Sequence, residues 1–142
     1  ERLEGFCDEL EKHGCKPARD MLARGAYTFE SGMECTHTLL ENPNPPTAIF
    51  ASNDEMAVGA INAAREMGLK VPDDLSVAGF DDSILASRIM PALTTIRRPV
   101  REMARLATTK LIAAIDGRHE DAHAGNMLVP ELVTRNSTRS ID

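Results

Sequence analysis

Residues 47–82 constrain the fold of this chain more than any other stretch, because they read as a strand, a helix and a second strand. An apolar run at 48–51 is too short for a helix. Asn53 then opens a helical pattern with acidic residues in its first turn, and Gly68 stands where that pattern ends. A second β-rich run covers 75–80. A crossover of this length predicts a right-handed parallel βαβ unit.

A polar side chain follows each of the two predicted strands, Asn53 after the first and Asp81 after the second. The carboxyl ends of parallel strands meet at one edge of a sheet, where open α/β sheets bind small ligands. An amide and a carboxylate placed there suit vicinal hydroxyls or the edge of a heterocycle. The sequence leaves open the alternative that Asn53 only caps its helix and Asp81 only caps a turn.

The remaining segments are predicted to be mostly helical. The predicted helices span residues 1–13, 28–41 and 99–116, with a short helical turn at 17–22. The other predicted strands are 93–97 and a β-prone stretch at 127–134, which Pro130 divides. The chain after Asp82 is predicted to be irregular, although Ile89 and Met90 leave more apolar surface there than a loop usually has.

Composition narrows the class of protein. The 142 residues, of which 42% are apolar, suffice for one domain of ordinary size, and no apolar run approaches a membrane span. A net charge of −6 argues against this chain gripping a phosphate backbone by itself. Its three cysteines are odd in number and lack metal-type spacing, which favours reduced thiols in the cytoplasm. The helical pattern begins at the first residue without an initiator Met, so we expect a fragment of a longer protein.

Few motifs suggest catalysis. Residues 119–123 match the zinc-protease pattern H-E-x-x-H, but they follow the helix-ending Gly117 in a polar connector, where that chemistry lacks its rigid helix. Asn136-Ser137-Thr138 fits a glycosylation pattern that would require secretion. No nucleophile–base arrangement or glycine-rich phosphate loop stands out. We therefore expect no enzyme, no metal and no cofactor.

Several motifs in fixed order carry a family resemblance. They are RLEGF at 2–6, NDEMAVGA at 53–60, GLKVPDDLSV at 68–77, GFDD at 79–82, PALTTI at 91–96 and LVTRNST at 132–138. This set, which covers essentially the whole chain, closely resembles the LacI/GalR family of bacterial transcription regulators. The tail is similar to the family's Arg-Glu-Ser ending, with Asn136 in place of the usual Glu.

The resemblance implies the fold class and the domain organisation. It implies an α/β fold, a Rossmann-like lobe with a parallel sheet from the type I periplasmic-binding-protein-like fold, in truncated form. Residues 1–96 and 131–142 would form the C-terminal lobe, and residues 97–130 would be a returning segment of the N-terminal lobe. The rest of that lobe and the DNA-binding headpiece would lie outside this sequence.

The resemblance also implies a function and its residues. A small metabolite, most simply a sugar, would bind between the lobes and modulate operator binding by a cytoplasmic homodimer. Carried over by position, the effector contacts are Arg2, Tyr27, Asn53 and Asp81. Val100 falls where some relatives have an aromatic residue. The expected dimer contacts are Val58, Ile61, Asn62, Ile89 and Met90.

Two other functions remain open at this point. A periplasmic sugar-binding protein of an ABC transporter would share the fold, although free cysteines and the regulator-like tail weigh against it. An enzyme on a doubly wound sheet would need an activated nucleophile or a cofactor motif, and the sequence displays neither.

Overall fold

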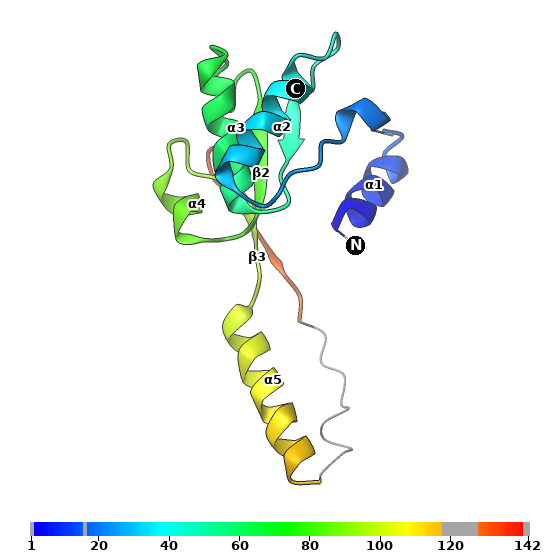
Figure 1. Cartoon of the computed structure of the whole chain (residues 1–142), viewed down its shortest axis with the longest axis vertical. Coiled ribbons are helices and arrows are strands. Elements are labelled where there is room, and N and C mark those ends of the chain that lie inside the picture. The colour runs from blue at the N-terminus through cyan, green and yellow to red at the C-terminus, as the bar shows by residue number, and fades with distance from the viewer. Residues whose placement is uncertain (1, 16, 118–127, 141–142) are drawn as a thin grey trace.

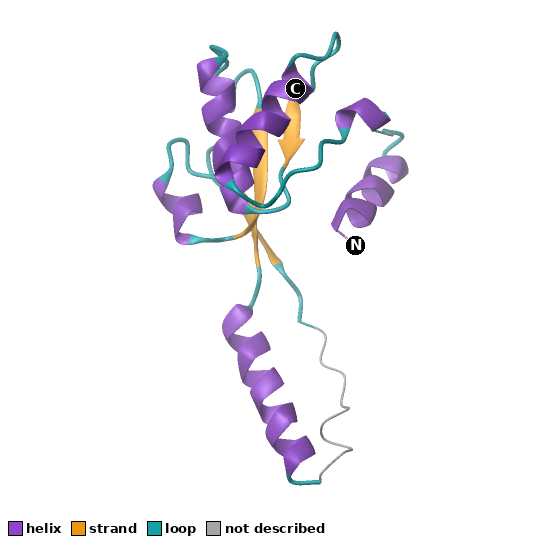
Figure 2. Cartoon of the chain, viewed as in Figure 1, coloured by secondary structure: helices purple, strands orange, loops and turns teal. Residues whose placement is uncertain are grey.

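Four strands form an open sheet in the order β1–β2–β3–β4 (Figures 1 and 2). The computed structural model describes residues 2–15, 17–117 and 128–140, with strands β1 (Ala48–Phe50), β2 (Ser76–Asp81), β3 (Thr94–Arg97) and β4 (Glu131–Val133). The first three strands run parallel, and β4 pairs antiparallel with β3. The predicted α/β class with a mainly parallel sheet is confirmed.

The predicted βαβ unit is present, with α3 (Asp54–Glu66) crossing from β1 to β2. The Asn53 side chain accepts a hydrogen bond from the Met56 amide at 3.0 Å and so caps the helix. At the other end, Gly68 has a φ of +79°, a left-handed conformation that glycine adopts without steric cost. The helix therefore begins and ends where its sequence signals predict.

The hydrophobic core lies between α3 and the sheet. Three of its members on α3 are alanines, and those on or beside the strands are larger: Ala57, Ala60, Ala64, Leu75, Val77 and Leu93, each at most 1% exposed. Small side chains let the helix lie close to the sheet, so that the larger residues fill the space between them.

Helix α2 (Phe29–Leu40) crosses α3 at very close range. It begins at the predicted cap Thr28, and the two helices nearly touch at Gly32 and Gly59. A Cβ atom added at Gly59 would lie 2.2 Å from the carbonyl oxygen of Phe29. This crossing therefore requires a residue without a side chain.

The shorter elements agree with the sequence in part. Helix α1 (Arg2–Lys12) and the 3-10 turn η1 (Arg19–Met21) lie where helical segments are predicted. The prediction of an irregular chain after Asp82 is wrong, because α4 (Ile84–Arg88) forms there and is too short to show helical periodicity. The β-prone stretch at 127–134 yields only β4: residues 128–130 are not strand, since Pro130 cannot donate to a ladder, and residue 127 lies outside the described residues.

Helix α5 (Val100–Ile115) projects away from the body that the other elements form (Figure 1). Its apolar side chains face solvent in this chain: Val100 is 53% exposed, Leu111 62% and Ile115 75%. The helix agrees with the prediction for 99–116. No described helix combines the length and apolar character needed to cross a membrane.

The segment after β4 is tied across the sheet. The buried hydroxyl of Ser137 donates to the Val77 carbonyl at 2.6 Å and accepts from the Thr94 amide at 2.8 Å. One side chain thus joins the tail to β2 and β3 at once. These bonds satisfy backbone groups that burial would otherwise leave unpaired.

Asp82 fastens the same tail to the end of β2. Its carboxylate accepts from Arg135 Nη2 at 2.5 Å and from Arg97 Nε at 2.6 Å, and its side chain is 10% exposed. Burial disfavours the charged form, but the hydrogen bonds and positive charges of Arg135 and Arg97 outweigh it. The pKa of Asp82 therefore lies below its ordinary value.

The helix crossing gives a first prediction. Gly59→Ala should lower the free energy of unfolding by about 1–3 kcal/mol, the usual cost of overpacking, because the new methyl group meets backbone that cannot move away easily. Urea unfolding measures the change. Gly5→Ala in α1 is the matched control, since a Cβ there meets nothing within 4 Å. A Gly59→Ala protein as stable as the Gly5→Ala protein would contradict the close crossing.

The Asp82 contacts give a second prediction. Asp82→Asn should cost about 2–3 kcal/mol at pH 7, the scale of a lost charge-assisted hydrogen bond. Because its folded pKa is lowered, Asp82 stabilises the fold above the unfolded carboxyl value of about 3.9 and loses this effect as pH falls through the folded value. Urea unfolding of wild type and variant should therefore differ at pH 7 and converge in strong acid.

The exposed Asp73 supplies the control for that experiment. Asp73→Asn should change the free energy of unfolding by less than about 0.5 kcal/mol at either pH. A difference between wild type and Asp82→Asn that persists undiminished in strong acid would show that the carboxylate charge is not what holds the tail.

Candidate functional site

Asn53 and Asp81 occupy equivalent positions at the carboxyl edge of the parallel sheet. Phe50 pairs with Ala78 in the β1–β2 register, and each polar residue comes three positions after its member of that pair. Neighbouring strands lie about 4.8 Å apart. The two residues are therefore neighbours at one edge although they are far apart in the sequence.

The Asn53 amide group has two structural contacts. Its oxygen caps α3, and its nitrogen donates to the Tyr27 carbonyl at 3.0 Å. Asn53 therefore does cap its helix, as the alternative interpretation of the sequence proposed, and it also contacts the loop before α2. A primary amide has two N–H donors and two acceptor lone pairs, so each end of Asn53 keeps capacity for one further partner.

Arg2 reaches the same edge from α1. Its Nη1 donates to the Ser52 carbonyl at 2.8 Å, and its Cζ lies 4.4 Å from the centre of the Phe80 ring. No carboxylate among the described residues pairs with this guanidinium group. Stacking of Phe6 on Phe50, with ring centres 5.5 Å apart, holds α1 against β1. Arg2 therefore lies beside the residues that immediately precede Asn53 and Asp81.

Tyr27 lies in the loop that Asn53 holds. Its φ is 63°, an uncommon value for a residue with a side chain, and the residue is 57% exposed. The hydrogen bond from Asn53 to its carbonyl fixes the backbone and leaves the ring open to solvent. An exposed aromatic face next to polar groups can stack on a planar or sugar ring.

Asp81 has the most unusual backbone of the four residues, with a φ of 122°. Its Oδ1 lies 2.8 Å from Arg98 Nε, yet these two buried atoms do not make a well-aligned hydrogen bond with each other or with other described groups. They form an ion pair by proximity only.

Arg98 also reaches this edge, and the sequence did not indicate it as a candidate site residue. A signal was available, because Asp81 pairs with Arg97 in the β2–β3 register. The residue after Arg97 therefore leaves the sheet at the same edge as Asn53 and Asp81.

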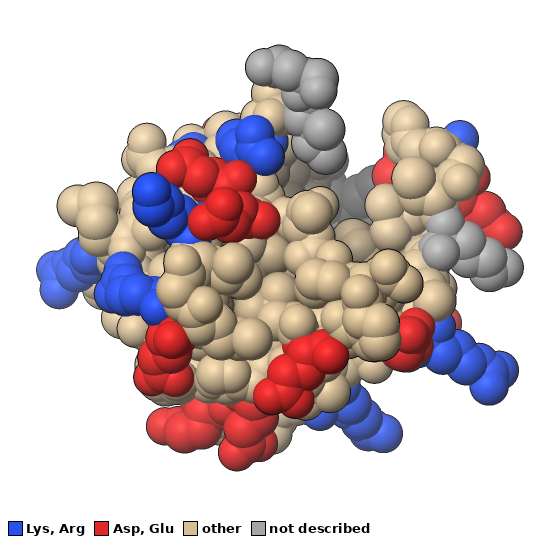
Figure 3. All heavy atoms as spheres, turned by 90° about the horizontal axis from the view of Figure 1, so that it is seen from above, with Lys and Arg blue, Asp and Glu red and all other residues tan. Residues whose placement is uncertain are grey.

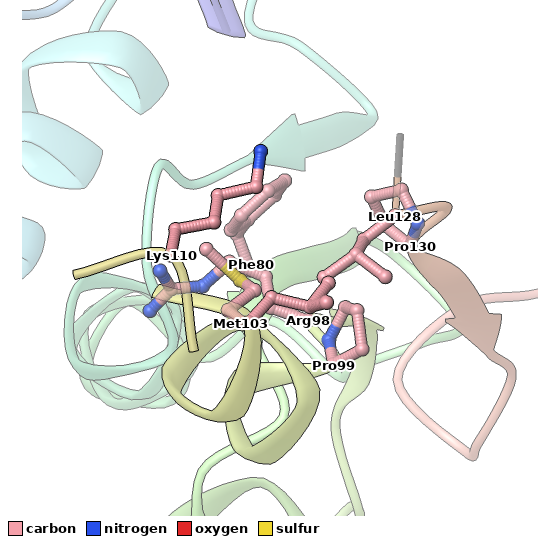
Figure 4. A pocket seen from close by; sticks show the side chains of 8 residues that line it. Phe80, Arg98, Pro99, Met103, Lys110, Leu128 and Pro130 are labelled. Atoms are coloured by element: carbon pink, nitrogen blue, oxygen red, sulfur yellow. The ribbon is translucent and has the colours of Figure 1, made fainter. Parts of the chain in front are cut away.

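Two hollows adjoin this edge. One, of about 420 Å³, lies between the end of β2 and α5 and is lined by Phe80, Arg98 and several apolar side chains (Figure 4). The other, of about 480 Å³, is lined by Asp81, Arg98, Val100 and neighbouring charged residues. Arg2, Tyr27 and Asn53 line neither hollow. The structure therefore brings the four expected residues to one edge, but these two hollows enclose only Asp81 among them.

The side chains at this edge are suited to binding a small molecule. A guanidinium fork, an amide, a carboxylate and an exposed aromatic ring can hold hydroxyls, a heterocycle or an anionic group. The described residues contain no cluster of three His, Cys, Asp or Glu side chains suited to a metal ion. The H-E-x-x-H residues lie outside the described part of the chain.

The residues expected at a dimer interface differ in how far they are buried. Ile61 is 2% exposed and packs in the core, so its side chain offers no surface to a partner. Val58, Asn62 and Ile89 are half-buried, and Met90 is 78% exposed. Figure 3 views the end of the body away from α5, where acidic and basic side chains are interspersed around a broad uncharged area.

Comparisons with known proteins agree on one kind of relative. A family model described as a periplasmic binding protein-like domain matches residues 1–138. The HTH-type transcriptional repressor CytR of Escherichia coli strain K12 is 41% identical over 141 residues, which are 99% of this chain and 41% of that protein. The chain thus spans less than half the length of this curated relative.

Solved structures give the same picture. The Escherichia coli transcriptional repressor ascG superposes with a TM-score of 0.84 at 36% identity, over 98% of this chain and 50% of that one. A lac repressor dimer bound to operator and an anti-inducer superposes with a TM-score of 0.85 at 34% identity, over 98% of this chain and 47% of that one.

Proposed function

This chain belongs to the family of periplasmic binding protein-like domains found in LacI-type transcriptional regulators, and we propose that it senses a small metabolite for such a regulator, with a sugar as the first candidate. The observation that supports this most directly is the convergence of Arg2, Asn53 and Asp81 on one edge of the parallel sheet. Curated relatives such as CytR are named as transcriptional repressors or regulators, which supports a regulatory role over a transport one.

We assign the roles of the site residues by their chemistry. Arg2 would hold two ligand oxygens with its fork, Asp81 would accept from hydroxyl groups, and Tyr27 would stack on the ligand face. Asn53 would add a donor and an acceptor while it keeps the Tyr27 loop in place. The contacts of Asn53 with the protein support a positioning role as much as a binding one.

The proposed lobes follow from where the chain leaves the body. Residues 1–96 and 131–142 would form one lobe, and residues 97–130 would belong to a second lobe. The apolar side chains that α5 exposes support this assignment, because an amphipathic helix needs a surface to cover it. The remainder of the second lobe and the DNA-binding headpiece would come from other parts of the protein.

A ligand between two lobes acts by its differential contacts with the open and closed arrangements. Closure would change the spacing of the two headpieces of a dimer and hence its affinity for operator DNA. Such coupling is typically about 1–3 kcal/mol. A regulator of this kind works where the DNA is, so we place the protein in the cytoplasm.

The site assignment gives a third prediction. Arg2→Ala and Asp81→Ala should each weaken effector binding at least about tenfold, or 1.4 kcal/mol. Each change removes a charged partner of the ligand. Calorimetry on the full-length protein, with an effector found by a thermal-shift screen of sugars, sugar phosphates and purines, measures the affinity. The exposed Arg19 supplies the control, and Arg19→Ala should bind normally. Unchanged affinity in both variants would contradict the assignment of Arg2 and Asp81 as effector-binding residues.

The same family supports a homodimer through the surface around Met90. Val58, Asn62 and Ile89 flank the proposed surface, and the neighbouring α4 exposes Ile84 to 68% and Leu85 to 45%. Exposed apolar side chains grouped in this way are typical of a protein interface.

The dimer surface gives a fourth prediction. Met90→Asp should raise the dimer dissociation constant at least tenfold, since it would place a charge in an apolar contact. Sedimentation equilibrium on the full-length protein measures the change. Leu22→Asp, at a residue 39% exposed elsewhere on the body, should leave it unaltered. A wild-type protein that stays monomeric throughout would refute the dimer itself.

A further inference from the structure

We propose that Asp54 and Thr95 are positioning residues of the effector site, which set its affinity by fixing the backbone that follows Asp81. This inference rests on the proposed function, because it assigns the buried residues that keep that site in its binding conformation. The sequence indicated neither residue for the site, and the assignment depends on hydrogen bonds that only the structure shows.

Both residues lie beneath the edge and not on it. Asp54 is 1% exposed and Thr95 0%, and neither lines the two hollows there. Asp54 opens α3 directly after Asn53, where the positive end of the helix dipole favours a carboxylate. Thr95 lies within β3, the strand beside β2. Neither side chain can touch a ligand at the edge, so any effect on binding has to pass through other residues.

Their hydrogen bonds lead to the turn after Asp81. One carboxylate oxygen of Asp54 accepts from the Ser83 amide and the other from the Thr95 hydroxyl, each at 2.6 Å. The Thr95 oxygen in turn accepts from the Asp82 amide at 3.4 Å. A hydroxyl has a single donor, so donation to Asp54 leaves the lone pairs of Thr95 for Asp82. Both amides that follow Asp81 are therefore bound, directly or through Thr95, to one buried carboxylate.

This turn needs such support. Asp81 and Asp82 have φ values of 122° and 55°, which residues with side chains adopt only where surrounding contacts fix them. Asp81 Oδ1 has no well-aligned hydrogen bond among the described residues, although it lies 2.8 Å from Arg98 Nε. The direction of the Asp81 side chain is therefore set mainly by its backbone. A binding residue has to stay within about 0.5 Å of its productive position, so freeing the two amides would misplace Asp81.

The same carboxylate also bears on Asn53. Since Asn53 immediately precedes Asp54, the bonds from Asp54 to β3 and to the turn fix the start of α3 relative to the sheet. The Asn53 side chain donates to the Tyr27 carbonyl from that position. Asp54 therefore ties together the two edge residues that follow neighbouring strands.

Thr94 supplies a matched control for a purely structural role. It precedes Thr95 in β3, is 5% exposed, and its hydroxyl is hydrogen-bonded to the Arg135 amide and the Thr138 hydroxyl, each at 2.9 Å. These bonds fasten the tail and do not reach the turn after Asp81. Valine at either position keeps the shape of threonine without its hydroxyl. Both variants therefore lose buried hydrogen bonds, but only Thr95→Val releases the turn.

The affinity of the full-length protein tests the proposal. The probe is whichever of glucose, ribose, glucose 6-phosphate and adenosine binds the wild type most tightly in calorimetry. Thr95→Val should weaken its binding about tenfold or more, because apparent affinity falls with the fraction of protein that keeps the binding-competent turn. Thr95→Ser restores the hydroxyl and should stay within about threefold of wild type. Thr94→Val should also stay within that range, while it unfolds at a lower urea concentration.

Asp54→Asn is the second variant, because an amide nitrogen in place of one oxygen cannot accept from both donors. It should weaken binding about tenfold as well. Amide hydrogen exchange adds a measurement that needs no probe. Residues 81–84 should exchange at least about tenfold faster in Thr95→Val or Asp54→Asn than in Thr94→Val.

Equal affinity in Thr95→Val and Thr94→Val, or exchange of residues 81–84 unchanged from wild type, would overturn this inference and leave the proposed function standing. Failure of every probe to bind the wild type would overturn both.

Discussion

The buried carboxylate of Asp54 joins three parts of this structure beneath the candidate site at the carboxyl edge of the sheet. The residue is 1% exposed, and its oxygens accept from Thr95 Oγ1 and from the Ser83 amide, each at 2.6 Å. These bonds connect the start of α3, strand β3 and the turn between β2 and α4. A buried carboxylate is tolerated only with such partners, and loss of one partner exposes the full cost of its burial. A Cβ atom on Gly79 would lie 2.6 Å from Asp54 Oδ1, so β2 needs glycine there to leave room for the carboxylate.

The candidate site is built on backbone that the rest of the fold holds in uncommon conformations. Tyr27, Asp81 and Asp82 have positive φ values of 63°, 122° and 55°. Such conformations cost free energy and persist only where the surrounding contacts fix them. Such contacts are present at Tyr27 and Asp82: Asn53 donates to the Tyr27 carbonyl, and Arg97 and Arg135 donate to the Asp82 side chain. Conformational cost concentrated at one edge of a sheet is typical of a binding site.

Sequence patterns predicted the parts of this fold that depend on local signals. The helix cap at Asn53 and the strand periods predict the βαβ unit, and parallel pairing then places Asn53 beside Asp81. Local signals do not predict whether a residue is buried, because burial depends on which elements pack together. Asp54 reads as an ordinary acidic residue in a first helical turn, and Ile61 reads as surface on its helix, yet both are buried. The position of Arg98 beside Asp81 becomes clear only from the register of β3 against β2.

The two neighbouring aspartates at the end of β2 differ in how firmly they are held, and this difference bears on how a ligand could act. Asp82 is bound by two guanidinium groups with good hydrogen-bond geometry, whereas Asp81 faces Arg98 without it. Arg97, which contacts Asp82, and Arg98, which contacts Asp81, stand just before α5, at the point where the chain leaves the body. A ligand that engages Asp81 or Arg98 therefore competes with the weaker of two links, while the stronger one keeps β2 and β3 joined. In the proposed two-lobe arrangement, a ligand bound there would act on the junction between the body and α5, where a change in the relative position of the lobes would begin.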